Sequence, residues 1–271
     1  MQRFKFQHPN CNVVDIDLAI SCFTSVLVTI PHEFIPGLLV NLGVAHTLRY
    51  NSTHDPHSLD SAIRHLQHAA DNFPTLHDEI RSVMFNNLGI AYRRRVHHTD
   101  TCKAGDLDQA ISNLKQALEL TDVDDVGRCA RMANLGNCYY SRFNHSFDSD
   151  DITQAILWHE NAVNSARASP PERSRALICL GMSLCRRYEH TKDPAHVQKA
   201  ISAYREAATQ ADVDPVIRLD AAEEWALHSI HHPPDVVHHL GSMTLGKATL
   251  MQVNIEKDNS EFLMAYGDHR R

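Results

Sequence analysis

Asparagine recurs along this sequence of 271 residues at a nearly constant interval, with arginines near it, and both side chains can bind another molecule. Asn41, Asn87 and Asn134 each stand directly before a Leu-Gly pair, and Cys179 takes that place before a fourth pair. A side-chain amide both donates and accepts hydrogen bonds, so such a series can pair with polar groups of a ligand. Arginine, whose planar fork suits carboxylates, occupies four nearby positions: Arg93, Arg94, Arg175 and Arg186.

Helical spacing places these arginines on the same face as the asparagine position, because residues three, four and seven apart share one side of a helix. Counted from the residue before Leu-Gly, this face includes Arg93 and Arg94, then Tyr140, then Arg175 and Arg186. We therefore expect a surface for an extended peptide that carries acidic side chains or a free C-terminus. Two alternatives stay open: the asparagines bond a neighbouring helix, and the arginines are solvated or pair with local acids.

Two landmarks predict the elements that position these residues. Leu-Gly pairs begin at positions 42, 88, 135 and 180, in steps of 46, 47 and 45 residues. Ala-Ile pairs begin at 19, 62, 110, 155 and 200, in steps of 43, 48, 45 and 45 residues. Apolar and small residues follow both landmarks at helical spacing. Each repeat therefore reads as a first-type helix that carries Leu-Gly, a polar turn, and a second-type helix that carries Ala-Ile.

The glycine of each Leu-Gly pair has a packing interpretation. A glycine inside a helix costs roughly 0.5–1 kcal/mol relative to alanine, so its repetition implies the close approach of a neighbouring helix. We assign it to packing rather than to catalysis or phosphate binding. An arginine follows each Leu by seven residues and is expected to close the first-type helix: Arg49, Arg95, Arg142 and Arg187.

The pattern resembles the tetratricopeptide repeat (TPR), with Leu-Gly-x-x-Tyr on its first helix and small residues on its second. Leu135-Gly136-Asn137-Cys138-Tyr139 is the best copy. The Gly-to-Ala offset here is 19 or 21 residues, against about twelve in the usual unit of about 34, and we expect the extra residues in the turn. Asp55-Pro56 and Asp193-Pro194 are expected to start second-type helices, with an N-cap acid and Pro at the first helical position.

This long-turn variant is similar to repeats of large fungal proteins that often end in a caspase-like (CHAT) domain. The resemblance implies an all-α fold, a right-handed α-solenoid of stacked antiparallel helix pairs. It covers residues 14–232 as four full pairs with a half unit at each end, and residues 233–271 are expected to form a short irregular tail.

By the same resemblance, the position before Leu-Gly faces a concave groove, where the three asparagines would form a ladder along a peptide backbone. The implied function is a non-enzymatic scaffold for protein-protein interaction. The alternative is a sensor or oligomerisation module, derived from a larger signalling protein with a caspase-like effector domain. Neither end of the array has a clear polar cap, so self-association through the ends is a further expectation.

Composition narrows the partners and the chemistry. A net charge of −7 with neutral histidine argues against binding to nucleic acids or anionic membranes. The seven cysteines include no C-x-x-C pair, which favours reduced thiols in the cytoplasm, and we expect none of them to pair with a base. The twenty histidines lack ligand spacing, so no metal site is expected. Phosphate-loop, G-x-S-x-G, H-E-x-x-H and caspase-type signatures are missing, so we expect neither an enzyme nor a cofactor.

Overall fold

The computed structural model describes residues 12–96, 104–165 and 167–231. Every regular element within these ranges is a helix, which confirms the predicted all-α class. The chain divides into two compact units, residues 1–123 (unit 1) and 124–271 (unit 2), which are described separately. The expected tail, residues 233–271, lies outside the described ranges.

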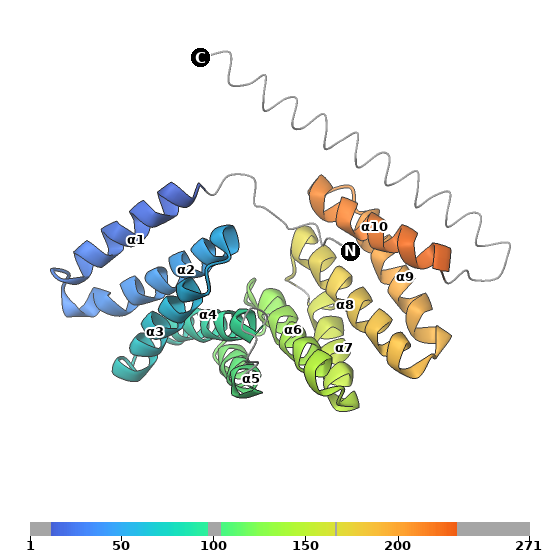
Figure 1. Ribbon diagram of the computed structural model, residues 1–271, viewed down its shortest axis with the longest axis horizontal. Helices are drawn as coiled ribbons and strands as arrows, with labels where there is room; N and C mark the ends of the chain where they lie inside the picture. The colour runs from blue at the N-terminus through green and yellow to red at the C-terminus, as the bar shows by residue number, and fades with distance from the viewer. Residues whose placement is uncertain (1–11, 97–103, 166, 232–271) are drawn as a thin grey trace, which may run out of the picture. The chain divides into compact units, whose positions relative to one another are not determined.

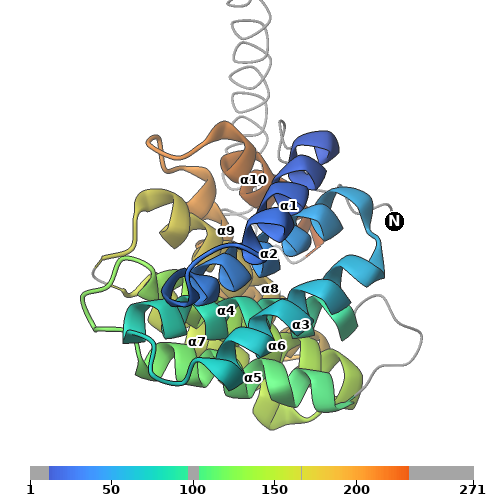
Figure 2. The ribbon, with the colours of Figure 1, turned by 90° about the vertical axis from the view of Figure 1, so that its left-hand side faces the viewer.

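Each unit is a stack in which every helix packs against the next one along the chain. In unit 1, first-type helices α2 and α4 alternate with second-type helices α1, α3 and α5, and Figure 2 shows α1 nearest the viewer, over α2. Its elements are α1 (Val13–Leu27), the 3-10 turn η1 (His32–Phe34), α2 (Ile35–Thr53), α3 (Pro56–Asn72), α4 (Asp78–Val96) and α5 (Ala104–Glu119). The described part of unit 2 begins and ends with a first-type helix (Figure 1): α6 (Arg128–Ser146), α7 (Ser149–Val163), α8 (Pro170–Thr191), α9 (Pro194–Ala208) and α10 (Pro215–His231).

The repeated glycines lie where the two helices of a pair touch, as predicted. A Cβ atom at Gly43 would lie 2.8 Å from Cδ2 of Leu66, and one at Gly181 would lie 2.6 Å from the ring of Tyr204. Leu66 and Tyr204 hold the same repeat position, four residues after the Ala of Ala-Ile. Gly89 meets Leu114 and Gly136 meets His159 in the same way. The Leu-Gly step therefore marks the contact that fixes each pair.

The expected long turn is wrong for three of the four pairs, because only two residues separate α2 from α3, α6 from α7 and α8 from α9. Residues 97–103, between α4 and α5, lie outside the described ranges. α2 ends at Thr53 and α3 begins at Pro56, so only His54 and Asp55 lie between them. His54 has a left-handed backbone with φ of 56°, which ends a helix abruptly. The expected N-cap is confirmed, since the Asp55 carboxylate accepts from the backbone N–H of His57 at 3.1 Å. The extra residues of this repeat lie in longer helices rather than in a loop.

The second predicted cap, Asp193, is confirmed in the same way. Lys192 has φ of 60°, and the Asp193 carboxylate accepts from the N–H of Ala195 at 2.9 Å. Beyond α9, Trp225 takes the place of the Leu of Leu-Gly on α10 and is fully buried among Leu184, Tyr204 and other residues of the unit 2 core. This helix therefore packs against α9 as the first helix of a further pair would.

Candidate functional site

First-type helices pack against one another in both units. α2 contacts α4 in unit 1, and α8 contacts both α6 and α10 in unit 2. No comparable packing joins the described parts of α3 and α5, or of α7 and α9. The first-type helices therefore line the inner side of each stack, which is the side that repeat proteins use as a binding surface.

The three asparagines lie on these helices in different environments. Asn41 on α2 is exposed, whereas Asn87 on α4 and Asn134 on α6 are partly buried. The amide nitrogen of Asn87 donates to the carbonyl oxygen of Val83 at 2.9 Å, one turn earlier in the same helix. Because the structure divides into two units, it places Asn41 and Asn87 in unit 1 and Asn134 in unit 2.

Arg93 and Arg94 lie together in the last turn of α4, and each has a buried guanidinium nitrogen. Nε of Arg93 and Nη1 of Arg94 are buried, and neither has a hydrogen-bond partner within the described ranges. Burial, and then the charge of Arg93, lower the pKa of Arg94 to about 10. Both arginines also act on the phenol of the buried Tyr50 on α2, whose pKa burial raises and their charges lower. The pair is thus a desolvated cationic site between α2 and α4.

The predicted residues of unit 2 do not form one cluster. Tyr140 on α6 is partly buried and Arg175 on α8 is exposed. Arg186 lies eleven residues beyond Arg175 on α8, roughly 16 Å along the helix axis. Arg186 already has partners within the chain, since its Nε donates to Oδ1 of Asn144 at 2.8 Å and its Nη1 forms an ion pair with Glu189 at 2.6 Å. Its guanidinium also lies over Phe143 on α6 and over Phe147, the residue after the end of α6.

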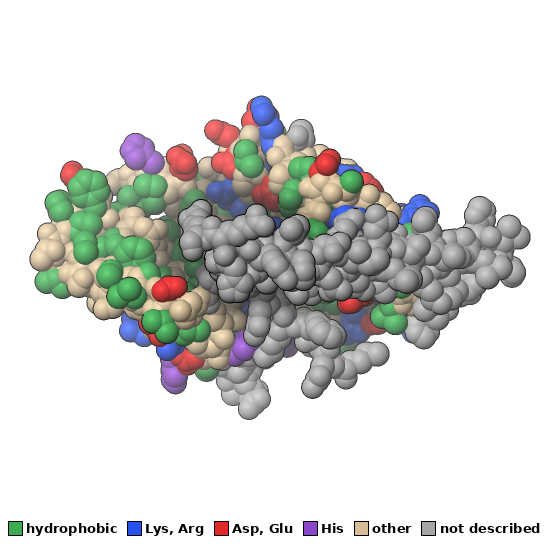
Figure 3. Space-filling view, turned by 90° about the horizontal axis from the view of Figure 1, so that it is seen from above, with side chains coloured by type: hydrophobic (Ala, Val, Ile, Leu, Met, Phe, Trp, Pro, Cys, Tyr) green, Lys and Arg blue, Asp and Glu red, His purple; other side chains and the backbone are tan. Residues whose placement is uncertain are grey.

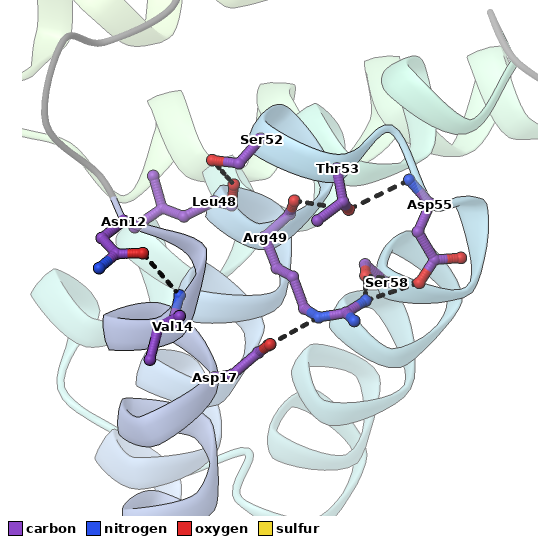
Figure 4. Close-up of polar contacts among 9 residues, drawn as sticks. All are labelled: Asn12, Val14, Asp17, Leu48, Arg49, Ser52, Thr53, Asp55 and Ser58. Atoms are coloured by element: carbon purple, nitrogen blue, oxygen red, sulfur yellow. Dashed lines mark hydrogen bonds and ion pairs between the residues drawn. The ribbon is translucent and has the colours of Figure 1, made fainter.

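The arginines seven residues after each Leu form a network that the sequence did not reveal. Figure 4 shows the first of them, Arg49, reaching from α2 to both neighbouring second-type helices. Its Nε donates to Asp17 on α1 at 2.8 Å, and its Nη1 donates to Asp55 at 2.6 Å and to Ser58 on α3 at 2.7 Å. These bonds raise the pKa of Arg49 and lower that of the Asp55 carboxyl. We call these four arginines, Arg49, Arg95, Arg142 and Arg187, the clamp arginines.

Arg95 on α4 also contacts both neighbouring second-type helices, with the roles of its nitrogens exchanged. Its Nε and Nη2 atoms hold the carboxylate of Asp106 on α5 at 2.9 and 2.7 Å, and its Nη1 reaches Asp60 on α3 at 3.0 Å. In unit 2, Arg142 holds the buried Asp151 on α7 through the same edge, at 2.9 and 2.7 Å. Arg95 and Arg142 therefore each bind the first turn of the following helix. Each ion pair stabilises the packing of the two helices that it joins. The sequence contained a signal for these ion pairs, because an acid follows Arg142 by nine residues and Arg95 by eleven.

The expectation that no cysteine pairs with a base is wrong for Cys185 on α8. Its Sγ atom lies 3.4 Å from Nε2 of His228 on α10, and Oε2 of Glu224 lies 3.5 Å from the same nitrogen. The hydrogen bond to Cys185, followed by that to Glu224, raises the pKa of His228 to about 9. The ring of Tyr204 stacks on His228 at 5.8 Å between centroids. Since Cys185 lies on α8 and His228 and Glu224 lie on α10, the histidine joins these two first-type helices.

The described histidines do not gather at one site. His97 and His98 lie outside the described ranges, and Nδ1 of His145 donates to the carbonyl oxygen of Ser141 on its own helix at 2.8 Å. No group of three or more potential metal ligands gathers in residues 12–96, 104–165 and 167–231. Within the same ranges, no helix has both the length and the hydropathy that crossing a membrane requires.

We compared the chain with protein families, curated proteins and solved structures. No family model and no curated protein matches the chain significantly. Among solved structures, BtubC (BKLC) from P. vanneervenii aligns over 92% of this chain and 91% of its own, with a TM-score of 0.52 and 12% identity. A Podosopora anserina protein described as a putative kinesin light chain with nearly identical TPR-like repeats aligns over 82% of this chain and 97% of its own, with a TM-score of 0.51 and 18% identity. A singly substituted form of that protein gives a TM-score of 0.53 at 16% identity. The TPR-like repeat fold is thereby confirmed, and at this identity the likeness concerns the fold alone.

Proposed function

We propose that this TPR-like chain is a non-enzymatic interaction scaffold of the cytoplasm, which binds an extended acidic peptide along its first-type helices. The arginine pair at the end of α4 carries this proposal. Nε of Arg93 and Nη1 of Arg94 are buried without a partner in the described part of the chain. A buried donor left unpaired costs about 1–3 kcal/mol, and more when it is charged. A ligand that supplies an acceptor to both atoms recovers that free energy on binding.

The chemistry of the pair favours a carboxylate-bearing ligand. Two adjacent guanidinium groups repel each other in a desolvated site, so an anion between them relieves both the repulsion and the missing hydrogen bonds. The C-terminal end of α4 has a partial negative charge that favours nearby cations, but it supplies no acceptor to the two buried nitrogens. Asn41 is exposed on the neighbouring helix α2 and is available to a peptide backbone.

Under the same proposal, the first-type helices of unit 2 contribute weaker contacts to the peptide. Its first-type helices present Asn134, Tyr140 and the exposed Arg175. Arg186 would contribute only after releasing Glu189 or Asn144, so we expect it to add less than the α4 pair. The strongest acidic contact of a partner is therefore expected at Arg93 and Arg94.

A direct test compares two labelled peptides on the full chain. Fluorescence anisotropy would follow a fluorescein-labelled Glu-Ala repeat peptide and the corresponding Gln-Ala peptide. We expect the acidic peptide to bind and the neutral one to bind at least about tenfold more weakly, since each 1.4 kcal/mol corresponds to about a factor of ten. The variant Arg93→Gln/Arg94→Gln should lose a similar factor for the acidic peptide only.

Arg64→Gln is the matched control, because Arg64 is an exposed arginine of unit 1 on a second-type helix. It removes one positive charge outside the proposed surface and should leave binding of the acidic peptide nearly unchanged. Equal binding of that peptide by the wild type and the double variant, with unchanged circular dichroism, would reject the proposal.

A second candidate, self-association through an uncapped helix, rests on α1. Val14, Leu18 and Val26 follow one another at four- and eight-residue spacing on this helix and are 67%, 62% and 44% exposed. Figure 3 shows hydrophobic side chains gathered over the part of unit 1 where α1 lies. Exposed apolar faces of this kind favour association, as expected of a sensor or oligomerisation module. Sedimentation velocity distinguishes self-association from peptide binding by a monomer. A concentration-dependent dimer that the substitution Leu18→Lys dissociates would support self-association through α1. A monomer at all concentrations would exclude it.

A further inference from the structure

The fourth clamp arginine lacks the carboxylate that the other three hold. Arg187 on α8 uses Nη1 to reach the preceding second-type helix, donating to the carbonyl of Ser149 at 3.0 Å and to Oγ1 of Thr153 at 2.8 Å. Arg95 reaches its preceding second-type helix with the same nitrogen. The Nε–Nη2 edge of Arg187, however, has no partner among the described residues, and Arg187 forms no ion pair there.

Two positions ahead of Arg187 explain this difference. Nine residues after Arg142 stands Asp151, which that arginine binds through its Nε–Nη2 edge, whereas nine residues after Arg187 stands His196. Nδ1 of His196 contacts Thr191 at 3.4 Å and Asp193 at 3.7 Å. Asp193 lies six residues after Arg187, as Asp55 does after Arg49, but its carboxylate caps α9 and contacts His196, and forms no ion pair with Arg187.

A cleft occupies this place between α7, α8 and α9. Its volume is about 190 Å³, and it is lined by Thr153, Ile156, Glu160, Leu184, Arg187, His196 and Lys199. Arg187 and Lys199 supply two positive charges, and the exposed Glu160 supplies one negative charge at the rim. Ile156 and the buried Leu184 give the cleft an apolar part.

We propose that this cleft binds one aliphatic carboxylate, held by the Nε–Nη2 edge of Arg187 as Asp106 and Asp151 are held by their own clamp arginines. Lys199 adds a second cation, and the hydrocarbon part of the ligand packs on Ile156 and Leu184. The site lies between α7, α8 and α9, and none of its lining residues is among those proposed above to contact the peptide. It is also independent of Arg93 and Arg94.

A carboxylate fits better than a phosphate for two reasons. In two of the other repeats, the partner that the clamp geometry accommodates is a planar carboxylate bound through two parallel bonds. The apolar lining and Glu160 both disfavour a compact dianion, which cannot bury its charge against hydrocarbon and is repelled by the rim carboxylate. The ligand would be either a small free acid or the acidic side chain of a partner protein.

The test uses the full chain and nuclear magnetic resonance titration of the Arg187 side-chain Nε–H signal. The probes are propionate, propionamide, inorganic phosphate and N-acetylglutamate amide. We expect propionate to shift this signal saturably, and propionamide and phosphate to bind at least about tenfold more weakly. If N-acetylglutamate amide binds with the same affinity as propionate, the natural ligand is the acidic side chain of a partner protein. If it binds more weakly than propionate, the natural ligand is a small free acid.

Two variants and a control make the result decisive. His196→Asp places the missing acid nine residues after Arg187, so it should abolish the propionate response and raise the melting temperature of the unliganded chain. Arg187→Gln, followed by ligand-induced change in melting temperature, should lose the response without gaining stability. Arg205→Gln, an exposed arginine of α9 outside the cleft, should keep the wild-type response. Equal propionate binding by the wild type and His196→Asp, or phosphate binding tighter than propionate, would overturn the proposal.

Discussion

Alanine at Gly43 should destabilise unit 1, whereas alanine at Gly37 in the same helix should not. The added methyl group at Gly43 would lie 2.8 and 2.9 Å from the two terminal methyl carbons of Leu66, which is fully buried. Overpacking of this kind costs about 1–3 kcal/mol, and the helix gains roughly 0.5–1 kcal/mol from replacing glycine with alanine. The net loss is therefore about 0.5–2 kcal/mol. At Gly37 no atom lies within 4 Å of the new methyl group, so only the gain applies.

Urea unfolding followed by circular dichroism measures both variants, and an unchanged m-value shows that the same cooperative unit unfolds. The double variant Gly43→Ala/Leu66→Ala adds a further check. Leu66→Ala alone should cost about 2–5 kcal/mol because it leaves a cavity. The alanine methyl at position 43 fills part of that cavity, so the double variant should be more stable than the sum of the single effects predicts, by about 1 kcal/mol.

The outcome that refutes this reasoning is a Gly43→Ala protein as stable as the wild type or more stable, with single-variant effects that simply add in the double variant. That result would mean that α2 and α3 do not approach closely at this point. The Leu-Gly step would then need an explanation other than packing.

Three other predictions concern charged groups. Arg142→Ala should destabilise unit 2 by about 2–4 kcal/mol, more than Asp151→Ala does, because it leaves a carboxylate that is only 5% exposed without its counter-ion; urea unfolding of both variants measures the difference. The pKa of His228 is raised from 6.5 to about 9, so its stabilisation is complete below pH 6.5 and is lost as the pH rises through 9, by about 1–2 kcal/mol after allowance for solvent screening. His228→Gln should flatten that alkaline decline in unfolding free energy. The pKa of His46 is lowered to about 4 by burial, so stability falls as the pH drops below 6.5 toward 4, and His46→Leu should remove this acid loss.

Periodicity predicted the fold well because it reports on packing. The spacing from Gly43 to Leu66 places a position without a side chain against a position with a large one, and the structure has that contact. The turn was mispredicted because a polar stretch such as Asn51 to Asp55 reads as a loop. A helix tolerates exposed polar residues to its end, and α2 continues through Thr53 until the left-handed His54 stops it.

The polar network was harder to predict because its partners lack a constant spacing. Arg142 binds an acid nine residues ahead, whereas Arg95 binds one eleven residues ahead, in keeping with a Gly-to-Ala offset of 21 residues in that repeat against 19. Cys185 and His228 are 43 residues apart, about one repeat, so they become neighbours only when successive first-type helices are stacked. Contacts between repeats follow from the stacking register, which periodicity defines only approximately.

The three consecutive arginines at the end of α4 differ in what they bind within the described residues. Arg95 holds Asp106 and Asp60, and these bonds raise its pKa. Arg94, the residue before it, has its pKa lowered by burial and keeps an unpaired nitrogen among the described residues. Residues of one type, side by side on a helix, differ because a step of one residue turns the side chain to another face. Folding alone explains Arg95, whereas the desolvated Arg93 and Arg94 oppose folding. Their presence is therefore better explained by an anionic partner than by stability.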